Sequence, residues 1–148
     1  MNMKKIFYSL MIVLIGVCFA SCEEQPITNE TGAIKITITD IKATAATASC
    51  KPDDASKRYL FLCCKKAEFD SVGIQNMGNH IKESADLTIK MSDLSSYDDL
   101  AASGDMWVPL TMLTPNTQYV FSAVYFDINT AQPEKEINYT VFSTKSEE

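Results

Sequence analysis

The chain has little of what nucleic-acid binding, metal binding or acid–base catalysis would need. It holds 13 Lys and Arg against 19 Asp and Glu, a net charge of −6, whereas a nucleic-acid-binding protein needs a basic surface. There is a single histidine, His80, and no C-x-x-C pair. A zinc site and a Ser-His-Asp set are therefore unsupported. We expect no catalytic residue, no metal site, no cofactor and no nucleic-acid partner.

The carboxylates also lack the spacing of a functional cluster. Asp53-Asp54 and Asp98-Asp99 are adjacent pairs, and neighbouring side chains on a strand or helix diverge, so neither pair is a ready acid–base couple. No D-x-D-x-D-G calcium loop occurs. These charges are expected at solvated turns and helix starts.

Long apolar runs are absent except for one near the N-terminus. Lys4 and Lys5 precede the 15-residue apolar run of residues 6–20. This run is shorter than the ~20 residues that a membrane-spanning helix needs, and the pattern is typical of a signal peptide. Without residues 1–21 the net charge becomes −8, because both lysines are removed.

The apolar run ends in Phe19-Ala20-Ser21-Cys22, which resembles the lipobox of bacterial lipoproteins. In that family the cysteine is acylated and becomes the first residue after cleavage. The resemblance implies a signal peptide at residues 1–21, lipid attachment at Cys22 and an outer-membrane location. An ordinary secretory signal with a chance cysteine is the alternative.

Glu23 and Glu24 follow the cysteine directly. They resemble the acidic export signal on surface lipoproteins of Gram-negative gut anaerobes, which favours the outer surface over the periplasmic side. Residues 22–32 are expected to be the acylated cysteine and a tether that reaches ~35 Å when fully extended.

The rest of the chain shows the alternation of short β-strands. Ile34, Ile36 and Ile38 alternate with polar residues, as in a half-buried strand. Further strands are expected at 44–50, 59–64, 107–112, 119–126 and 137–142. The runs at 59–64 and 119–126 are apolar on both faces, although an antiparallel strand with one wet face should alternate. Both faces of these two strands are therefore expected to be buried.

Three segments resemble fibronectin type III domains. Leu113–Phe121 resembles the run into strand F, Val141–Thr144 the end of strand G, and Ala46–Pro52 strand B. The resemblance covers residues 33–144 and implies an immunoglobulin-like β-sandwich over residues 33–145, in which the hydroxyl of Tyr119 bonds back to the chain as a tyrosine corner.

Residues 65–105 depart from that family, and a helical insertion is expected at about residues 66–103. Ile74, Met77 and Ile81 fall on one helical face within residues 67–85, and Ser92–Ala102 is a candidate second short helix. We expect a helical insertion between strands C and E, covering the outer face of the sheet that holds 59–64 and 119–126.

The resemblance also implies an orientation on the membrane. In the fibronectin arrangement the N-terminus lies at the end that carries loops 51–58 and 127–136, so this end is expected to face the membrane. Residues 65–67 and 113–118 would then be distal, and recognition is expected at the insertion or the distal loops.

A few side chains remain as candidates. Cys63 and Cys64 point to opposite faces of one strand, so at most one of them can meet Cys50; a Cys50–Cys63 disulfide is geometrically conceivable, and buried free thiols are the alternative. Asp70-Ser71-Val72 matches a short O-glycosylation pattern of gut anaerobes, which marks Ser71. The strand aromatics are expected in the core, with Trp107, at the start of its strand, as the one most open to exposure.

The sequence therefore favours a lipid-anchored, non-enzymatic binding or assembly module with an unknown protein or glycan partner. A carbohydrate-binding accessory lipoprotein is the first alternative and needs an exposed Trp107 or tyrosine beside polar groups. A small hydrolase is the second, and needs a pocket with a perturbed carboxylate or with His80 beside a nucleophile. A structural subunit of a larger surface complex fits the sequence equally well.

Overall fold

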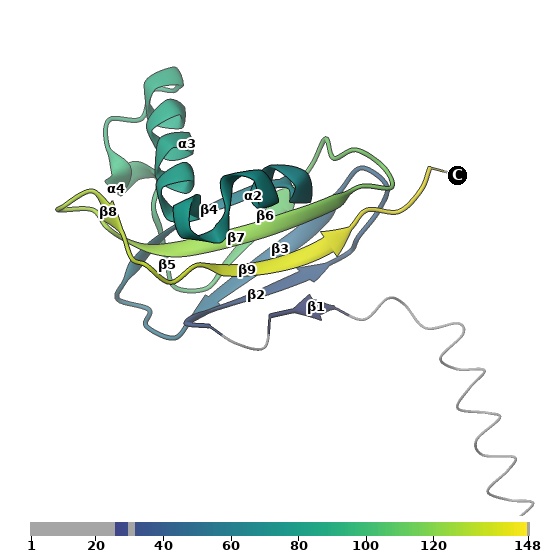
Figure 1. The fold of residues 1–148 in the computed structure, drawn as a ribbon. Helices are drawn as coiled ribbons and strands as arrows, with labels where there is room; N and C mark the ends of the chain where they lie inside the picture. The colour runs from purple at the N-terminus through teal and green to yellow at the C-terminus, as the bar shows by residue number, and fades with distance from the viewer. Residues whose placement is uncertain (1–25, 30–31, 148) are drawn as a thin grey trace, which may run out of the picture.

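The computed structural model describes residues 26–29 and 32–147. They form two antiparallel β-sheets packed face to face, with helices on one outer side (Figure 1). Within these residues, no helix has the length and apolar character needed to cross a bilayer. Cys22, Glu23 and Glu24, on which the lipoprotein prediction depends, lie outside the described residues.

The first sheet has the strand order β1-β2-β3-β6. Its strands are β1 (Ile27–Thr28), β2 (Ile34–Thr39), β3 (Ala46–Pro52) and β6 (Met106–Leu110). The second sheet has the order β5-β4-β7-β8, and β9 also pairs with β7. Its strands are β4 (Arg58–Lys65), β5 (Ala102–Ser103), β7 (Gln118–Asp127), β8 (Gln132–Pro133) and β9 (Asn138–Ser143).

Alternating side chains build the core between the sheets. Ile34, Ile36 and Ile38 of β2 are fully buried, and the polar residues between them point outwards, as the period of two predicts. Across the core they meet one face of β4 and β7. This cluster also contains Cys50, Tyr59, Tyr119, Phe121, Ala123, Tyr125 and Phe142.

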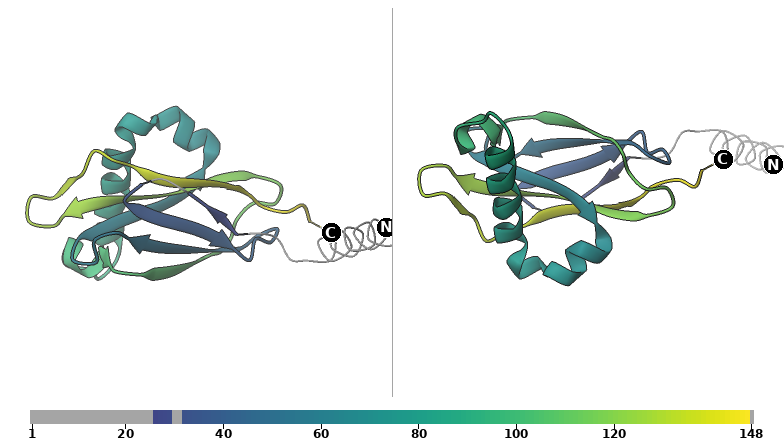
Figure 2. Two further views of the ribbon diagram at one scale, coloured as in Figure 1. Left: turned by 90° about the horizontal axis from the view of Figure 1, so that it is seen from below. Right: turned by 90° about the horizontal axis from the view of Figure 1, so that it is seen from above.

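The opposite faces of β4 and β7 are buried as well. Leu60 and Cys64 of β4, and Val120, Val124 and Phe126 of β7, form a second apolar cluster with the helices. Figure 2 shows the helical segment lying across this outer side of the sheet. The burial of both faces of these strands, expected because each run is apolar on both faces, is confirmed.

The helical segment runs from β4 to β5. It consists of α2 (Lys66–Val72), the 3₁₀ turn η1 (Ile74–Asn76), α3 (Met77–Met91) and α4 (Tyr97–Leu100). Gly73, with φ of 81°, separates α2 from η1, because this backbone conformation is open to glycine and breaks a helix. The second short helix, expected at 92–102, forms only at α4, which starts at a capping box between Ser96 and Asp99.

The buried stripe of α3 follows from its sequence. Met77, Ile81 and Ala85 recur every four residues and are buried against the second sheet. Most other positions of the helix are charged or polar, apart from Leu87, Ile89 and Met91 near its C-terminal end. The buried stripe therefore packs the first part of α3 against the second sheet.

The place expected for the incoming chain is wrong, because the chain doubles back before β2. Ile27 and Thr28, within the segment expected to be tether, pair antiparallel with Ile38 and Thr37. Asn29 fixes the reversal: its backbone N–H donates to the carbonyl of Ile36 (3.1 Å) and its side-chain amide to that of Ile34 (3.1 Å). The chain therefore enters beside the end of β2, not beside its start.

We call this end the C-terminal pole and define it by residues 40–45, 113–117 and 144–147. Backbone hydrogen bonds join its three parts, among them Lys145 N–H to the carbonyl of Lys42 (3.1 Å) and Asn116 N–H to that of Lys145 (2.9 Å). The opposite end, the hairpin pole, carries residues 53–57 and 128–134. Figures 1 and 2 show the C-terminus and the β8 hairpin at opposite ends of the sandwich.

Candidate functional site

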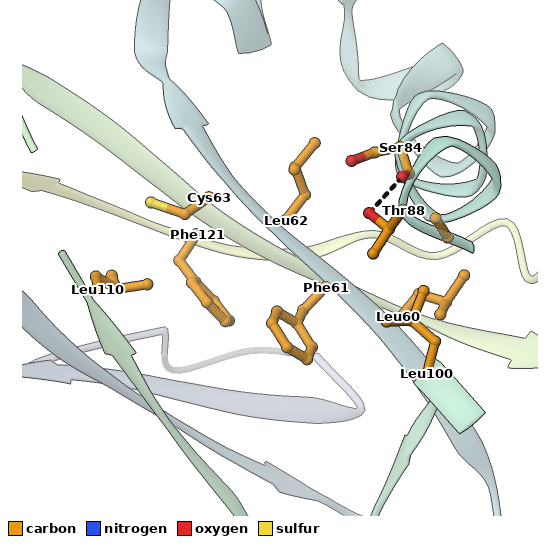
Figure 3. Close-up of a pocket in the computed structure, with 10 residues that line it drawn as sticks. Leu60, Phe61, Leu62, Cys63, Ser84, Thr88, Leu100, Leu110 and Phe121 are labelled. Carbon is orange, nitrogen blue, oxygen red and sulfur yellow. Dashed lines mark hydrogen bonds between the residues drawn. The ribbon is translucent and has the colours of Figure 1, made fainter. Parts of the chain in front are cut away.

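An apolar groove of about 290 Å³ lies beside β4 (Figure 3). It opens on the side of the sandwich where β4, β6, α3 and α4 meet. Its lining residues are Leu60, Phe61, Leu62, Cys63, Ser84, Ala85, Thr88, Leu100, Leu110 and Phe121. Carbon, hydroxyl and thiol groups make up its side-chain surface, which suits binding by apolar burial.

The groove reaches both faces of β4. Phe61 and Cys63 face the core between the sheets, and Phe61 stacks on Phe121 of β7 with ring centroids 5.6 Å apart. Leu60 and Leu62 face the helices. In Figure 3 the side chains of Phe61 and Leu62 lie on opposite sides of the strand. Each face of β4 therefore has its own apolar wall.

The groove is open because β5 is very short. β5 pairs with β4 only at Arg58 and Tyr59. From Leu60 to Lys65, no strand among residues 26–29 and 32–147 pairs with the side of β4 that faces away from β7. This stretch of β4, together with the groove, is the main candidate site of the molecule.

Arg58, at the start of β4, holds α4 in place beside the groove. Its guanidinium forms an ion pair with the side chain of Asp98 and donates through Nε to the carbonyl of Ala101 (3.2 Å). These contacts hold α4, and with it Leu100, against the start of β4. Asp98 thus serves as an anchor for α4, in keeping with the expected helix-start role.

The other adjacent carboxylates have structural roles too. Asp53 accepts a hydrogen bond from the Tyr125 hydroxyl (2.6 Å). Asp54 accepts from the Ser56 hydroxyl, which lowers the pKa of that carboxyl. The pKa of Asp99 is lowered as well, by hydrogen bonds from Ser95 and Ser96 at the start of α4. Each carboxylate closes a turn or caps a helix.

The three described cysteines are free, and the Cys50–Cys63 disulfide is not formed. Bridging would need Cα atoms within about 7 Å, whereas facing sheets usually lie about 10 Å apart. Burial raises the pKa of Cys50 and of Cys63 to about 12 and that of Cys64 to about 11. A thiol with a raised pKa is a poor nucleophile, so Cys63 contributes apolar surface to the groove.

His80 and Ser71 lie on the helices and do not line the groove. His80 Nε2 is 2.9 Å from a carboxylate oxygen of Glu68, which links α3 to α2. Ser71 is exposed on α2, so an O-glycan there stays a prediction. No group of three or more His, Cys, Asp or Glu that could hold a metal ion occurs within the described part of the chain.

The Tyr119 hydroxyl bonds back to the chain. It accepts a hydrogen bond from the backbone N–H of Thr114 (2.8 Å), and the Tyr119 ring stacks on Phe142 in the core. This is the contact that a tyrosine corner makes. It holds the 113–117 turn of the C-terminal pole against β7.

Trp107 stands apart from the other aromatic residues. It is 80% exposed, whereas most strand aromatics are buried as expected. Its place on β6 is opposite Ser49 of β3, on the outer face of the first sheet, where Thr47 and Lys51 lie on either side of Ser49. An exposed ring beside hydroxyl and amino groups is the feature that the carbohydrate alternative requires.

Two further exposed apolar side chains were not predicted as candidates. Leu87 is 59% and Met91 82% exposed on α3. Both belong to the same helical stripe as the groove residues Ser84 and Thr88, because the spacing is i, i+3, i+4 and i+7. The sequence feature that could have predicted them is a second set of large apolar residues on the helix, outside its buried stripe.

The comparisons with known proteins leave the family open. No protein-family model matches the chain, and no curated protein matches it. Among solved structures, the chain is similar to the sensor domain of the anti-sigma factor RsgI4 of Pseudobacteroides cellulosolvens, with 16% identity and a TM-score of 0.40 over 79% of this chain and 99% of that one.

Proposed function

We propose that the chain is a lipid-anchored, non-enzymatic binding module of the cell envelope, built on a fibronectin type III-like sandwich. The strand order supports the fold assignment. β2, β3 and β6 correspond to strands A, B and E, and β5, β4, β7 and β9 to C′, C, F and G. The helical segment then lies between C and C′. The hydrogen bond from Thr114 to Tyr119 supports the same assignment.

The groove beside β4 is the observation that carries the binding function. Its lining offers apolar surface on two faces of an open strand edge and no carboxylate, imidazole or amine. Such a surface gains free energy by excluding water from a partner, at about 25 cal/mol per Å² of apolar area buried. It has no group that would move a proton at neutral pH, which favours binding over hydrolysis.

The reversal at β1 supports a definite orientation on the membrane. Four peptide units separate Cys22 from Pro26, a span of at most ~14 Å, and Ile27 lies beside Ile38. With Cys22 acylated, the C-terminal pole faces the lipid and the hairpin pole faces away. Glu23 and Glu24 would direct the anchored domain to the outer surface.

This orientation is tested by short-range fluorescence quenching. A fluorophore is attached to Asn116→Cys at the C-terminal pole or to Thr130→Cys at the hairpin pole, and the acylated chain is reconstituted into vesicles that contain headgroup-spin-labelled lipid. The raised pKa values of Cys50, Cys63 and Cys64 keep the labelling of these native thiols slow. We expect strong quenching at position 116 and little at 130. Stronger quenching at 130 would contradict the orientation.

A second candidate function, carbohydrate binding at the cell surface, is favoured by Trp107. The exposed indole ring stands over a sheet face with threonine, serine and lysine side chains. Sugar rings stack on such aromatic faces while their hydroxyls bond to polar neighbours. The face is separate from the groove, since Trp107 does not line it.

The second candidate is tested with the fluorescence of Trp107, the only tryptophan of the chain. Iodide should quench its emission efficiently, and a soluble polysaccharide that binds should reduce this quenching. Trp107→Ala should then weaken binding in affinity electrophoresis about tenfold or more. Met112→Ala, at a residue that is 94% exposed, is the control and should bind normally. Equal retardation of the parent and Trp107→Ala would rule out this role for the ring.

A further inference from the structure

The open side of β4 is an unpaired strand edge within a groove. Beyond Tyr59, where the pairing with β5 ends, the stretch from Leu60 to Lys65 pairs on one side only, with β7. An unpaired edge presents a row of main-chain N–H and C=O groups, which is a template for another extended chain. Such edges are normally short, covered or charged. Here the edge is lined by apolar side chains.

The apolar walls have the geometry that an added strand needs. Successive side chains of a strand point to opposite faces, and a strand laid beside β4 would place alternate side chains on the two sides of the second sheet. One set would meet Phe61, Phe121 and Leu110, and the other Leu62 and the α3 residues. The groove therefore offers contacts to both faces of an incoming strand.

The exposed stripe of α3 extends the wall on the helix side. Thr88 lines the groove, and Leu87 and Met91, 59% and 82% exposed, continue the same stripe outwards. Exposed apolar patches of this kind mark interaction sites in soluble domains. The stripe and the edge thus form one continuous surface.

We propose that this surface binds an extended, largely apolar segment of a partner polypeptide, which adds to the edge of β4 as a further strand. A polypeptide is the fitting occupant because only a peptide backbone offers donors and acceptors at the repeat of a strand edge. The open stretch of six residues corresponds to ~20 Å of strand. This inference rests on the proposed binding function and names the class of partner.

The charge and the shape of the surface further restrict which polypeptides it can bind. Lys65 is exposed at the far end of the edge, and among the described residues no ion pair is formed by it, so an acidic residue at that end of the incoming strand would be complementary. A second copy of this chain fits less well, because its own β4 edge is recessed between the Leu110 and Thr88 walls. Two recessed edges cannot approach to pairing distance.

The test uses random dodecapeptides displayed on phage and selected on the full chain in detergent. The most enriched peptide is synthesised, and hydrogen–deuterium exchange is measured with and without it. We expect enriched sequences with apolar residues at alternate positions and an acidic residue at one end. The bound peptide should slow amide exchange in residues 61–65 about tenfold or more. Slowing confined to α3 would overturn strand addition, as would a failure to enrich any peptide.

Two matched variants locate the site. Thr88→Arg places a long charged side chain over the groove at an exposed helix position, so the fold should persist while peptide affinity falls about tenfold or more. Thr130→Arg makes the same change at the hairpin pole and should bind as the parent does. Equal affinity of both variants would refute the site. So would a dimer of the parent chain that Thr88→Arg converts to monomer, since a second copy would then be the occupant.

The test of strand addition is independent of the test of the lipid anchor. If the groove variants behave as expected but the chain carries no lipid, strand addition stands and the lipid-anchored location fails. If the chain is acylated but peptide binding ignores Thr88→Arg, the location stands and strand addition fails.

Discussion

Val124→Asp should unfold the domain under conditions in which the parent chain is stable. Val124 is fully buried at the centre of β7, on the face that α2 and α3 cover. An aspartate there must be buried as a charge or protonated, and nothing in the surrounding apolar cluster can pair with it. The expected loss is about 4 kcal/mol or more, a large share of the 5–15 kcal/mol that holds a typical domain folded.

Thermal and denaturant unfolding measure this effect. Thr130→Asp, the same charge introduced at an exposed turn position, is the control and should change the free energy of unfolding by no more than about 0.5 kcal/mol. If Val124→Asp left the melting temperature unchanged, the outer face of the second sheet would be open to solvent. The helices would then not be the third layer of the fold.

Much of this layered fold was predictable, because the number of buried faces of a strand determines its pattern of apolar residues. Ile34, Ile36 and Ile38 alternate with polar residues, and β2 is indeed buried on one face. The runs at 59–64 and 119–126 are apolar on both faces, and in the structure β7 is buried on both faces while β4 is buried or half-buried on both. Two apolar faces on these strands require a covering layer. The helical spacing of Met77 and Ile81 indicated that the layer is a helix.

The end of the sandwich at which the chain enters was not predictable from such patterns. The reversal before β2 rests on three hydrogen bonds between Asn29 and β2 and on only two paired residues, Ile27 and Thr28. Two residues carry no periodicity to detect. A fold-level analogy therefore placed the incoming chain at the wrong end of the sandwich.

The groove escaped prediction for a related reason. It exists because β5 ends after two residues and leaves the edge of β4 unpaired from Leu60 onwards. The length of a short edge strand depends on how α4 is held, here by Arg58 through Asp98 and Ala101. Such tertiary contacts cannot be predicted from the sequence. The apolar residues Leu87 and Met91 on α3 could have been, because they recur at helical spacing.

Cys22→Ser should release the chain from the membrane. Each methylene group of an acyl chain buried in the bilayer contributes ~0.8 kcal/mol, so the several chains of a lipoprotein give an essentially permanent anchor. A serine has no thiol to be acylated, so the variant should carry no lipid, and the cleaved chain should appear in the soluble fraction. Cys18→Ser, four residues earlier in the same apolar run, is the matched control and should leave the protein membrane-bound.

The most direct test of the lipid-anchored account is the intact mass of the chain extracted from the membranes of a Gram-negative host. We expect a chain that begins at Cys22 and carries the added mass of a diacylglyceryl group and an N-terminal acyl chain, with the modification located on Cys22 by fragmentation. A chain that begins at another residue, or an unmodified Cys22 in the membrane-extracted protein, would contradict the account.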